Sequence, residues 1–126
     1  MTDTNHGKDN AQAFLNNIVA MWEEWDGADE ERQEEIREEM EQEALSVEVR
    51  SSWQSVGEEM EADEYRILLT YGGPSLQIVG DLDQYKQPSS FKVQYQDWFK
   101  PWENMGLGVD EEKAVEWFLS FYWFGE

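Results

Sequence analysis

The stretch from Glu23 to Glu64 constrains this chain more than any other, because acidic residues crowd it. It holds 18 carboxylates against three arginines, and so carries 15 of the 20 net negative charges of the protein. Self-repulsion of this size destabilises a compact state. A net charge of magnitude about 2–8 is ample for the solubility of a small domain. The excess therefore favours a role for the charge, and a partner with a basic surface is the role that fits best.

The remaining composition indicates a folded protein with an acidic coat. Hydrophobic residues make up 40% of the 126 residues and aromatic residues 14%, which is too apolar for a disordered chain. The length suits one domain. We expect a flexible tail at residues 1–9 and a single domain at 10–126. Without cysteine, a basic leader or an apolar run of about 20 residues, the chain is expected to be soluble and cytoplasmic.

Two helices are predicted in the first half of the chain. Asn10 is a suitable cap for a helix that starts at Ala11 and ends at Gly27. Its apolar residues recur at three- and four-residue spacing, as in Phe14, Leu15, Ile18, Met21, Trp22 and Trp25. A second helix is predicted from Ala28 or Asp29 to about Leu45, because this segment contains good helix formers and no glycine or proline. We expect packing on the first helix to hold it.

The second half of the chain predicts strands and a closing helix. Residues 65–71 and 75–80 flank a Gly-Gly-Pro turn and form a predicted hairpin. Residues 91–96 alternate apolar with polar side chains, which favours a third antiparallel strand. Residues 46–53 alternate more weakly, 57–63 read as a loop, and the last helix starts at Asp110-Glu111-Glu112. The predicted fold class is α+β, with two N-terminal helices, a three-stranded antiparallel sheet and a C-terminal helix.

The glutamates of the second helix form the first candidate binding surface. Residues four apart on a helix advance by about 6 Å, which is of the order of the spacing between neighbouring phosphates on one nucleic-acid strand. Rows of glutamate side chains are thus able to stand where phosphates would. The alternative is an ordinary solvated helix face. The predicted partner-binding residues are Glu30, Glu31, Glu34, Glu35, Glu38, Glu39, Glu41 and Glu43.

Aromatic residues near the C-terminus form a second candidate surface. Trp98, Phe99 and Trp102 lie in a loop predicted at residues 97–108, and further rings follow from Trp117 to Phe124. Tryptophan and tyrosine are enriched at the energetic centres of interfaces. The competing interpretation is that these rings close the hydrophobic core, which we favour for the helix and weigh equally for the loop.

The sequence carries no recognisable catalytic or metal-binding motif, so we expect neither an enzyme nor a cofactor. The single histidine, His6, falls in the predicted tail, and no nucleophile elbow or phosphate-binding loop is present. Asp81 and Asp83 lack the spacing of a calcium loop and more plausibly close a turn. A weaker reading is an enzyme acting on a nucleotide, for which Arg50, Arg66, Lys92 and Lys100 are the available cations. Direct nucleic-acid or membrane binding is disfavoured at a pI of about 4.1.

Several segments resemble a family of small proteins encoded by bacteriophages and other mobile elements. The resemblance covers Ser46-Val47-Glu48-Val49-Arg50, Tyr71-Gly72-Gly73-Pro74 with Ile78-Val79-Gly80-Asp81-Leu82-Asp83, Tyr95-Gln96-Asp97-Trp98-Phe99-Lys100-Pro101-Trp102, and Phe121-Tyr122-Trp123-Phe124-Gly125-Glu126. It implies a setting of phage against host, in which small acidic proteins that inhibit CRISPR or restriction machinery are common. The acidic helix is not among the segments that carry the resemblance.

These observations lead to one functional hypothesis and one alternative. The hypothesis is a phage-encoded inhibitor that uses an acidic, DNA-mimicking surface to bind a host defence protein which normally holds nucleic acid, such as a CRISPR effector or restriction complex. The protein is expected to be a monomer or homodimer in the host cytoplasm. The alternative is a structural or assembly protein, or a homodimeric interaction protein, that uses the aromatic region 97–124.

Overall fold

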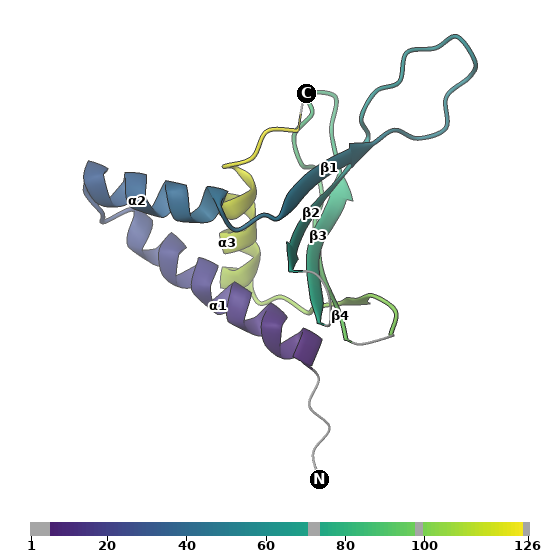
Figure 1. The fold of residues 1–126 in the computed structure, drawn as a ribbon. Coiled ribbons are helices and arrows are strands. Elements are labelled where there is room, and N and C mark those ends of the chain that lie inside the picture. The colour runs from purple at the N-terminus through teal and green to yellow at the C-terminus, as the bar shows by residue number, and fades with distance from the viewer. Residues whose placement is uncertain (1–5, 71–73, 98–99, 125–126) are drawn as a thin grey trace.

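The computed structural model describes residues 6–70, 74–97 and 100–124, which form an α+β structure (Figure 1). In these ranges three helices accompany a five-stranded antiparallel sheet. The elements are α1 (His6–Trp25), α2 (Glu30–Glu41), β1 (Ser46–Arg50), β2 (Glu64–Thr70), β3 (Ser75–Asp81), β4 (Lys92–Gln96), β5 (Glu103–Asn104) and α3 (Val109–Leu119). None of the helices in these ranges has the length and apolar character needed to cross a lipid bilayer.

The sheet is a meander in which each strand pairs with the next along the chain. Its order is β1-β2-β3-β4-β5, and Ile67 of β2 pairs with Val47 of β1 and Ile78 of β3. Ile78 pairs in turn with Val93 of β4. Because side chains alternate between the two faces of a strand, these residues share one face. Helix α1 lies against β3 and β4 on that face, and α3 packs mainly on α1.

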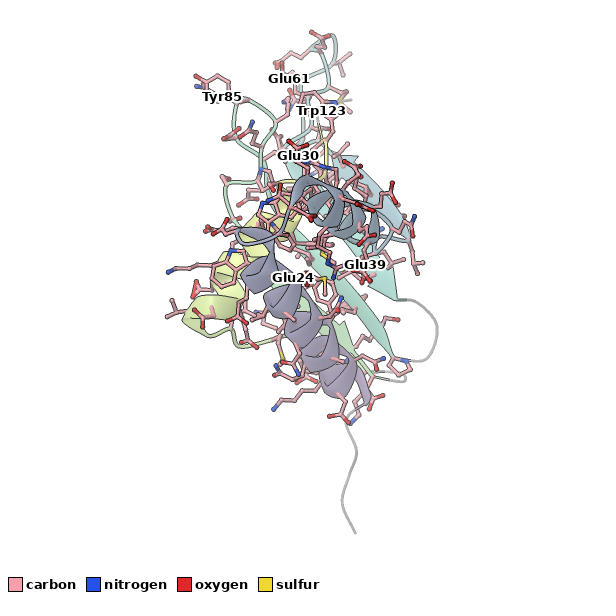
Figure 2. All side chains as sticks on the ribbon, turned by 90° about the vertical axis from the view of Figure 1, so that its left-hand side faces the viewer. Glu24, Glu30, Glu39, Glu61, Tyr85 and Trp123 are labelled. Carbon is pink, nitrogen blue, oxygen red and sulfur yellow. The ribbon has the colours of Figure 1, made fainter. Side chains whose placement is uncertain are left out.

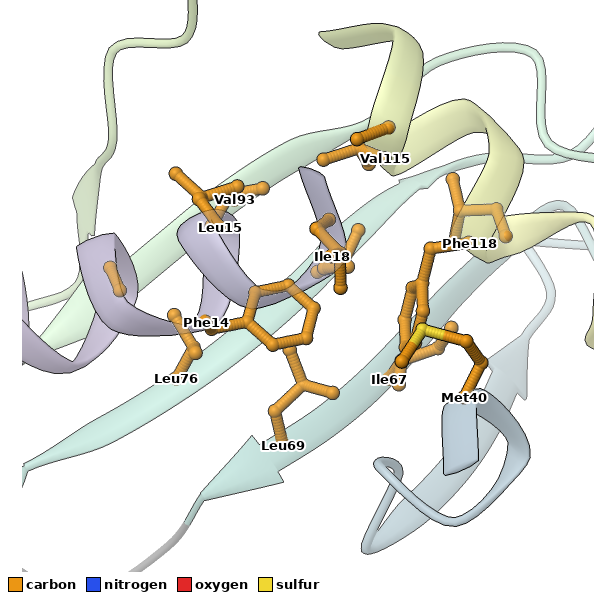
Figure 3. Packing of buried hydrophobic residues seen from close by; sticks show 14 of the residues in the cluster. Phe14, Leu15, Ile18, Met40, Ile67, Leu69, Leu76, Val93, Val115 and Phe118 are labelled. Carbon is orange, nitrogen blue, oxygen red and sulfur yellow. The ribbon is translucent and has the colours of Figure 1, made fainter. Parts of the chain in front are cut away.

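The hydrophobic core lies between this sheet face and the helices. Figure 3 shows Phe14 and Ile18 of α1, Met40 of α2 and Phe118 of α3 converging above Ile67. The rings of Phe14 and Phe118 meet edge to face, with centroids 5.3 Å apart. Every helix therefore contributes to the same cluster.

The predicted three-stranded sheet is only partly correct. The predicted strands at 65–71, 75–80 and 91–96 correspond to β2, β3 and β4, and their antiparallel pairing is confirmed. The structure adds a strand at each edge. The weak alternation at 46–53 becomes β1, and β5 lies inside the segment that we predicted to be a loop. With two residues, β5 has no periodicity to reveal it, and its place depends on pairing with Gln94 and Tyr95 of β4.

Both N-terminal helices differ from their predicted boundaries. Helix α1 begins at His6, five residues before the predicted start at Ala11, so the predicted tail at residues 1–9 is wrong from His6 onward. Gly7 is buried, and a Cβ atom there would lie 3.0 Å from the backbone of Gln96, so contact with the end of β4 extends the helix. Helix α2 ends at Glu41 rather than Leu45, because the chain turns there to enter β1.

Replacing Phe118 tests the core directly. The side chain is 0% exposed and contacts rings on both sides, Phe14 at 5.3 Å and Tyr122 at 5.1 Å between centroids. We expect Phe118→Ala to lower the free energy of unfolding by about 3–5 kcal/mol. Val109→Ala in the same helix, at a position 69% exposed, is the control and should change it by less than about 0.5 kcal/mol. Urea unfolding of both variants checks this, and equal losses would contradict the core assignment.

Candidate partner-binding surface

Helix α2 is held at both ends and along one side. At its start the Asp29 carboxylate accepts a hydrogen bond from the backbone N–H of Arg32 at 2.8 Å. Along its inner side Ile36 and Met40 are fully buried. Near its end the Tyr122 hydroxyl donates to the carbonyl oxygen of Met40. These contacts orient the helix, so its remaining side is turned outward.

The outward side of α2 carries most of the predicted glutamates. Seven of the eight are exposed, namely Glu30, Glu31, Glu34, Glu35, Glu38, Glu39 and Glu41. With about 3.6 residues per turn, they cover roughly half of the helix circumference opposite Ile36 and Met40. Figure 2 shows Glu30 and Glu39 on this side of the molecule, with Glu24 of α1 near them. The exposed glutamates thus form one continuous surface, which we call the α2 acidic face.

The two arginines of α2 do little to neutralise this face. Arg32 turns toward α1, where its Nε lies 2.5 Å from a carboxylate oxygen of Glu24, and it also reaches Glu35 at 3.2 Å. The Arg37 guanidinium lies over the rings of Trp25 and Phe121, 5.8 and 5.4 Å from their centroids, and 4.0 Å from Glu34.

Most of the face is consequently without a cationic neighbour. Within the described ranges, no cation lies within 4.0 Å of the carboxylates of Glu30, Glu31, Glu38, Glu39 and Glu41. Exposed carboxylates left unpaired in this way keep their charge available to a partner.

Glu43 stands apart from the other seven glutamates. Its side chain is half-buried, and one carboxylate oxygen accepts a hydrogen bond from the Asn17 amide of α1 at 3.3 Å. Burial, with a smaller contribution from the charge of Glu39, raises the pKa of Glu43. Glu24 shows the opposite direction, since its hydrogen bond from Arg32 lowers its pKa. Glu43 therefore lies at the margin of the acidic face rather than within it.

The predicted aromatic surface is divided by the structure. Trp98 and Phe99 lie outside the described residues. Trp102 is half-buried on the sheet face opposite the helices, where it lines a shallow depression of about 440 Å³ with Arg66, Gln77 and other strand residues. The rings of α3 are engaged within the protein. Trp117 and Phe121 both meet Trp25 edge to face, at 5.7 and 5.5 Å between centroids.

Two further groups of predicted residues have local partners. Asp83 accepts hydrogen bonds from the backbone N–H groups of Tyr85 and Gln87, at 2.8 and 3.1 Å, and so closes its own turn. Within the described ranges, no three acidic or histidine side chains gather as metal ligands would. Arg50 and Arg66 lie on the sheet face opposite the helices and line the same depression as Trp102. Each is paired with a glutamate, Arg50 with Glu64 and Arg66 with Glu48.

The sheet face opposite the helices carries the polar features that could not be predicted from the sequence. Gln77 donates a hydrogen bond to Gln94 at 2.8 Å, and Gln94 donates to Asn104 at 2.9 Å, so three strands are joined by a ladder of amides. The two arginine–glutamate pairs lie beside it. Both features depend on the register between strands, which the alternation of side chains indicates only for one strand at a time.

The raised pKa of Glu43 predicts a particular dependence of stability on pH. A carboxyl group whose pKa is raised in the folded state binds more protons there than in the unfolded state. The free energy of unfolding therefore falls as the pH rises from the pKa of the unfolded state to the raised pKa of the folded state. Glu43→Gln should stabilise the protein at pH 7, by about 0.2–0.5 kcal/mol from the lost repulsion of Glu39 alone, and should reduce this slope. Glu41→Gln, at an exposed position, is the control. Thermal unfolding between pH 4 and 8 checks both variants, and a slope steeper in Glu43→Gln than in the parent would contradict the assignment.

Comparisons with known proteins do not assign a function to this surface. The chain matches no protein-family model, no curated protein and no solved structure.

Proposed function

We propose that this protein binds a nucleic-acid-binding protein through the α2 acidic face and thereby blocks its nucleic-acid site. The observation that carries the proposal is the arrangement of charge on α2. Seven exposed glutamates share one side of the helix, while both arginines are drawn toward α1 and the aromatic rings beneath it. A basic cleft that normally holds phosphates would meet a similar density of negative charge on this face.

The position of the acids along the helices supports the same proposal. Carboxylates near the C-terminal end of a helix are unfavourable, because that end carries the negative end of the helix dipole. The last turns of α1 and α2 nevertheless contain glutamates and no basic residue, and only Glu24 is compensated, by Arg32. Charge needed only for solubility has no reason to occupy such costly positions. Helix α3 has three of its four acids, Asp110, Glu111 and Glu112, in the first turn, where they are favourable, and only Glu116 in its last turn.

The class of target follows from the sequence rather than from the geometry. The resemblance to phage-encoded proteins favours a host defence protein, such as a CRISPR effector or a restriction complex, as the bound partner. The alternative, a homodimer built on the aromatic region 97–124, has less support. Trp117 and Phe121 are occupied by Trp25, and Trp102 is half-buried against the sheet.

Charge reversal on the acidic face tests the proposal. The variant Glu34→Lys, Glu38→Lys, Glu41→Lys changes three exposed side chains and touches no buried residue. The matched control is Glu58→Lys, Glu59→Lys, Glu61→Lys in the exposed loop between β1 and β2, with the same change in net charge. We expect the α2 variant to lose capture of basic proteins from a host lysate and to stop inhibiting the target in a plasmid-interference assay, while the loop variant retains both. Equal loss in the two variants would show that net charge, not the face, is responsible.

Competition and salt provide a second prediction. If the acidic face takes the place of phosphates, duplex DNA should displace the captured partner, and affinity should fall by roughly tenfold or more between 50 and 200 mM salt. A contact anchored by aromatic rings would be nearly independent of salt. Fluorescence anisotropy with labelled protein, at several salt concentrations and with and without duplex DNA, measures both effects. Binding that resists salt and DNA would contradict mimicry.

A further inference from the structure

Strand β1 is an open edge of the sheet. It pairs with β2 along one side, residue by residue from Ser46 to Arg50 and without a bulge. Edge strands expose unpaired backbone groups, and proteins usually protect them with proline, lysine, bulges or very short length. The opposite edge is protected in this way, since β5 has two residues. Strand β1 has five residues and contains neither proline nor lysine, and its two charged residues, Glu48 and Arg50, are each neutralised by a residue of β2, so the edge remains available for pairing.

The side chains of β1 on the helix side of the sheet, Val47 and Val49, are apolar and 40% and 47% exposed. Leu45 just before the strand is 63% exposed, and Trp53 beyond it is 98% exposed. The cause is the position of the helices, because α1 lies over β3 and β4 and the helical layer ends before β1 (Figure 1). A regular row of exposed apolar side chains beside an open edge is typical of an interface.

The other face of the same strand carries alternating charges. Glu48 lies opposite Arg66 on β2, with Oε1 2.6 Å from a guanidinium nitrogen, and Arg50 lies opposite Glu64 at 2.7 Å. Both along β1 and across to β2, each charged side chain therefore has a neighbour of opposite charge. In the described part of the chain, no further strand lies beside Glu48 and Arg50 on the edge of β1 that faces away from β2.

We propose that β1 pairs with β1 of a second copy of this chain, antiparallel and centred on Val49, so that the two sheets become one. In this register Glu48 lies opposite Arg50 of the second copy, and Arg50 opposite its Glu48. Each of the two rows then crosses four strands with alternating sign, in the order Glu64, Arg50, Glu48, Arg66. Opposite charges in directly facing positions stabilise a strand pair, whereas like charges destabilise it.

The apolar row fits the same register. Val49 lies opposite Val49 of the second copy on the two-fold axis. Leu45 and Trp53 are each four residues from Val49, so continuation of the ladder places Leu45 opposite Trp53 of the second copy. Two exposed apolar side chains that flank β1, Leu45 at 63% and Trp53 at 98%, thereby cover one another. A register centred on Glu48 would instead put two glutamates face to face, and this is why the charges select Val49 as the centre.

The mass of the protein in solution tests the proposal. Sedimentation equilibrium in about 0.5 M salt, which screens the long-range repulsion between two acidic chains, should give twice the monomer mass of 14.9 kDa. Arg50→Glu places glutamates opposite each other and should weaken dimerisation at least tenfold. Lys92→Glu is the matched control, since Lys92 is exposed on the same sheet face but three strands from β1. A monomeric parent protein, a dimeric Arg50→Glu or a monomeric Lys92→Glu would each overturn the proposal.

Mixing two variants tests the register itself. Glu48→Arg and Arg50→Glu should each be monomeric, because each homodimer contains like charges in facing positions. Mixed in equal amounts they should form a heterodimer, since arginines of one copy then face glutamates of the other. Val49→Lys, at a position 47% exposed, gives an independent test by placing two ammonium groups at the two-fold axis, and should also be monomeric. Circular dichroism shows which variants are folded, and a folded pair that fails to associate would overturn the register.

Discussion

Two buried side chains, Ile36 and Met40, hold the acidic helix on the protein. The four glutamate pairs spaced four apart within α2 oppose the helix by roughly 0.8–2 kcal/mol in total, at about 0.2–0.5 kcal/mol per pair. Burial of an isoleucine and a methionine contributes about 1.5–3 kcal/mol each. Packing therefore prevails over repulsion, but not by much. The fold accommodates a strongly charged helix because both side chains join the shared hydrophobic cluster, where Met40 lies beside Phe118 of α3 and Ile67 of β2 (Figure 3).

The fold could be predicted where a single element carries its own periodicity. The apolar spacing from Phe14 to Trp25 defines most of α1, and the turn at 72–74 between two apolar runs indicates the hairpin of β2 and β3. The edges of the sheet could not be predicted in the same way. Strand β5 exists because Gln94 and Tyr95 offer it partners, and α1 reaches back to His6 because Gly7 lies against Gln96. These features depend on contacts between residues far apart in the sequence.

The candidate site could likewise be predicted from the sequence only in part. The exposure of seven glutamates follows from the positions of Ile36 and Met40 in the sequence, because a helix with one buried side must turn its other side outward. The half-buried position of Glu43 does not follow from the sequence, since it depends on Asn17 of a different helix. The opposed charges of β1 and β2 were equally hidden, because Arg50 and Arg66 read as isolated cations until the register places Glu64 and Glu48 beside them.

The acidic face and the open edge are linked through the chain, because α2 leads directly into β1. In an antiparallel pair centred on Val49, the two Ser46 residues are six residues apart along the ladder, which is about 20 Å at about 3.3 Å per residue. This distance between the two Ser46 residues exceeds the screening length of about 8 Å at physiological salt, so charges separated by it would repel each other weakly in the proposed dimer. A single basic cleft needs only one face, whereas a two-fold symmetric target engages both. The proposed pairing of β1 would therefore determine how many acidic faces are presented together, while burial of Ile36 and Met40 holds each helix in place.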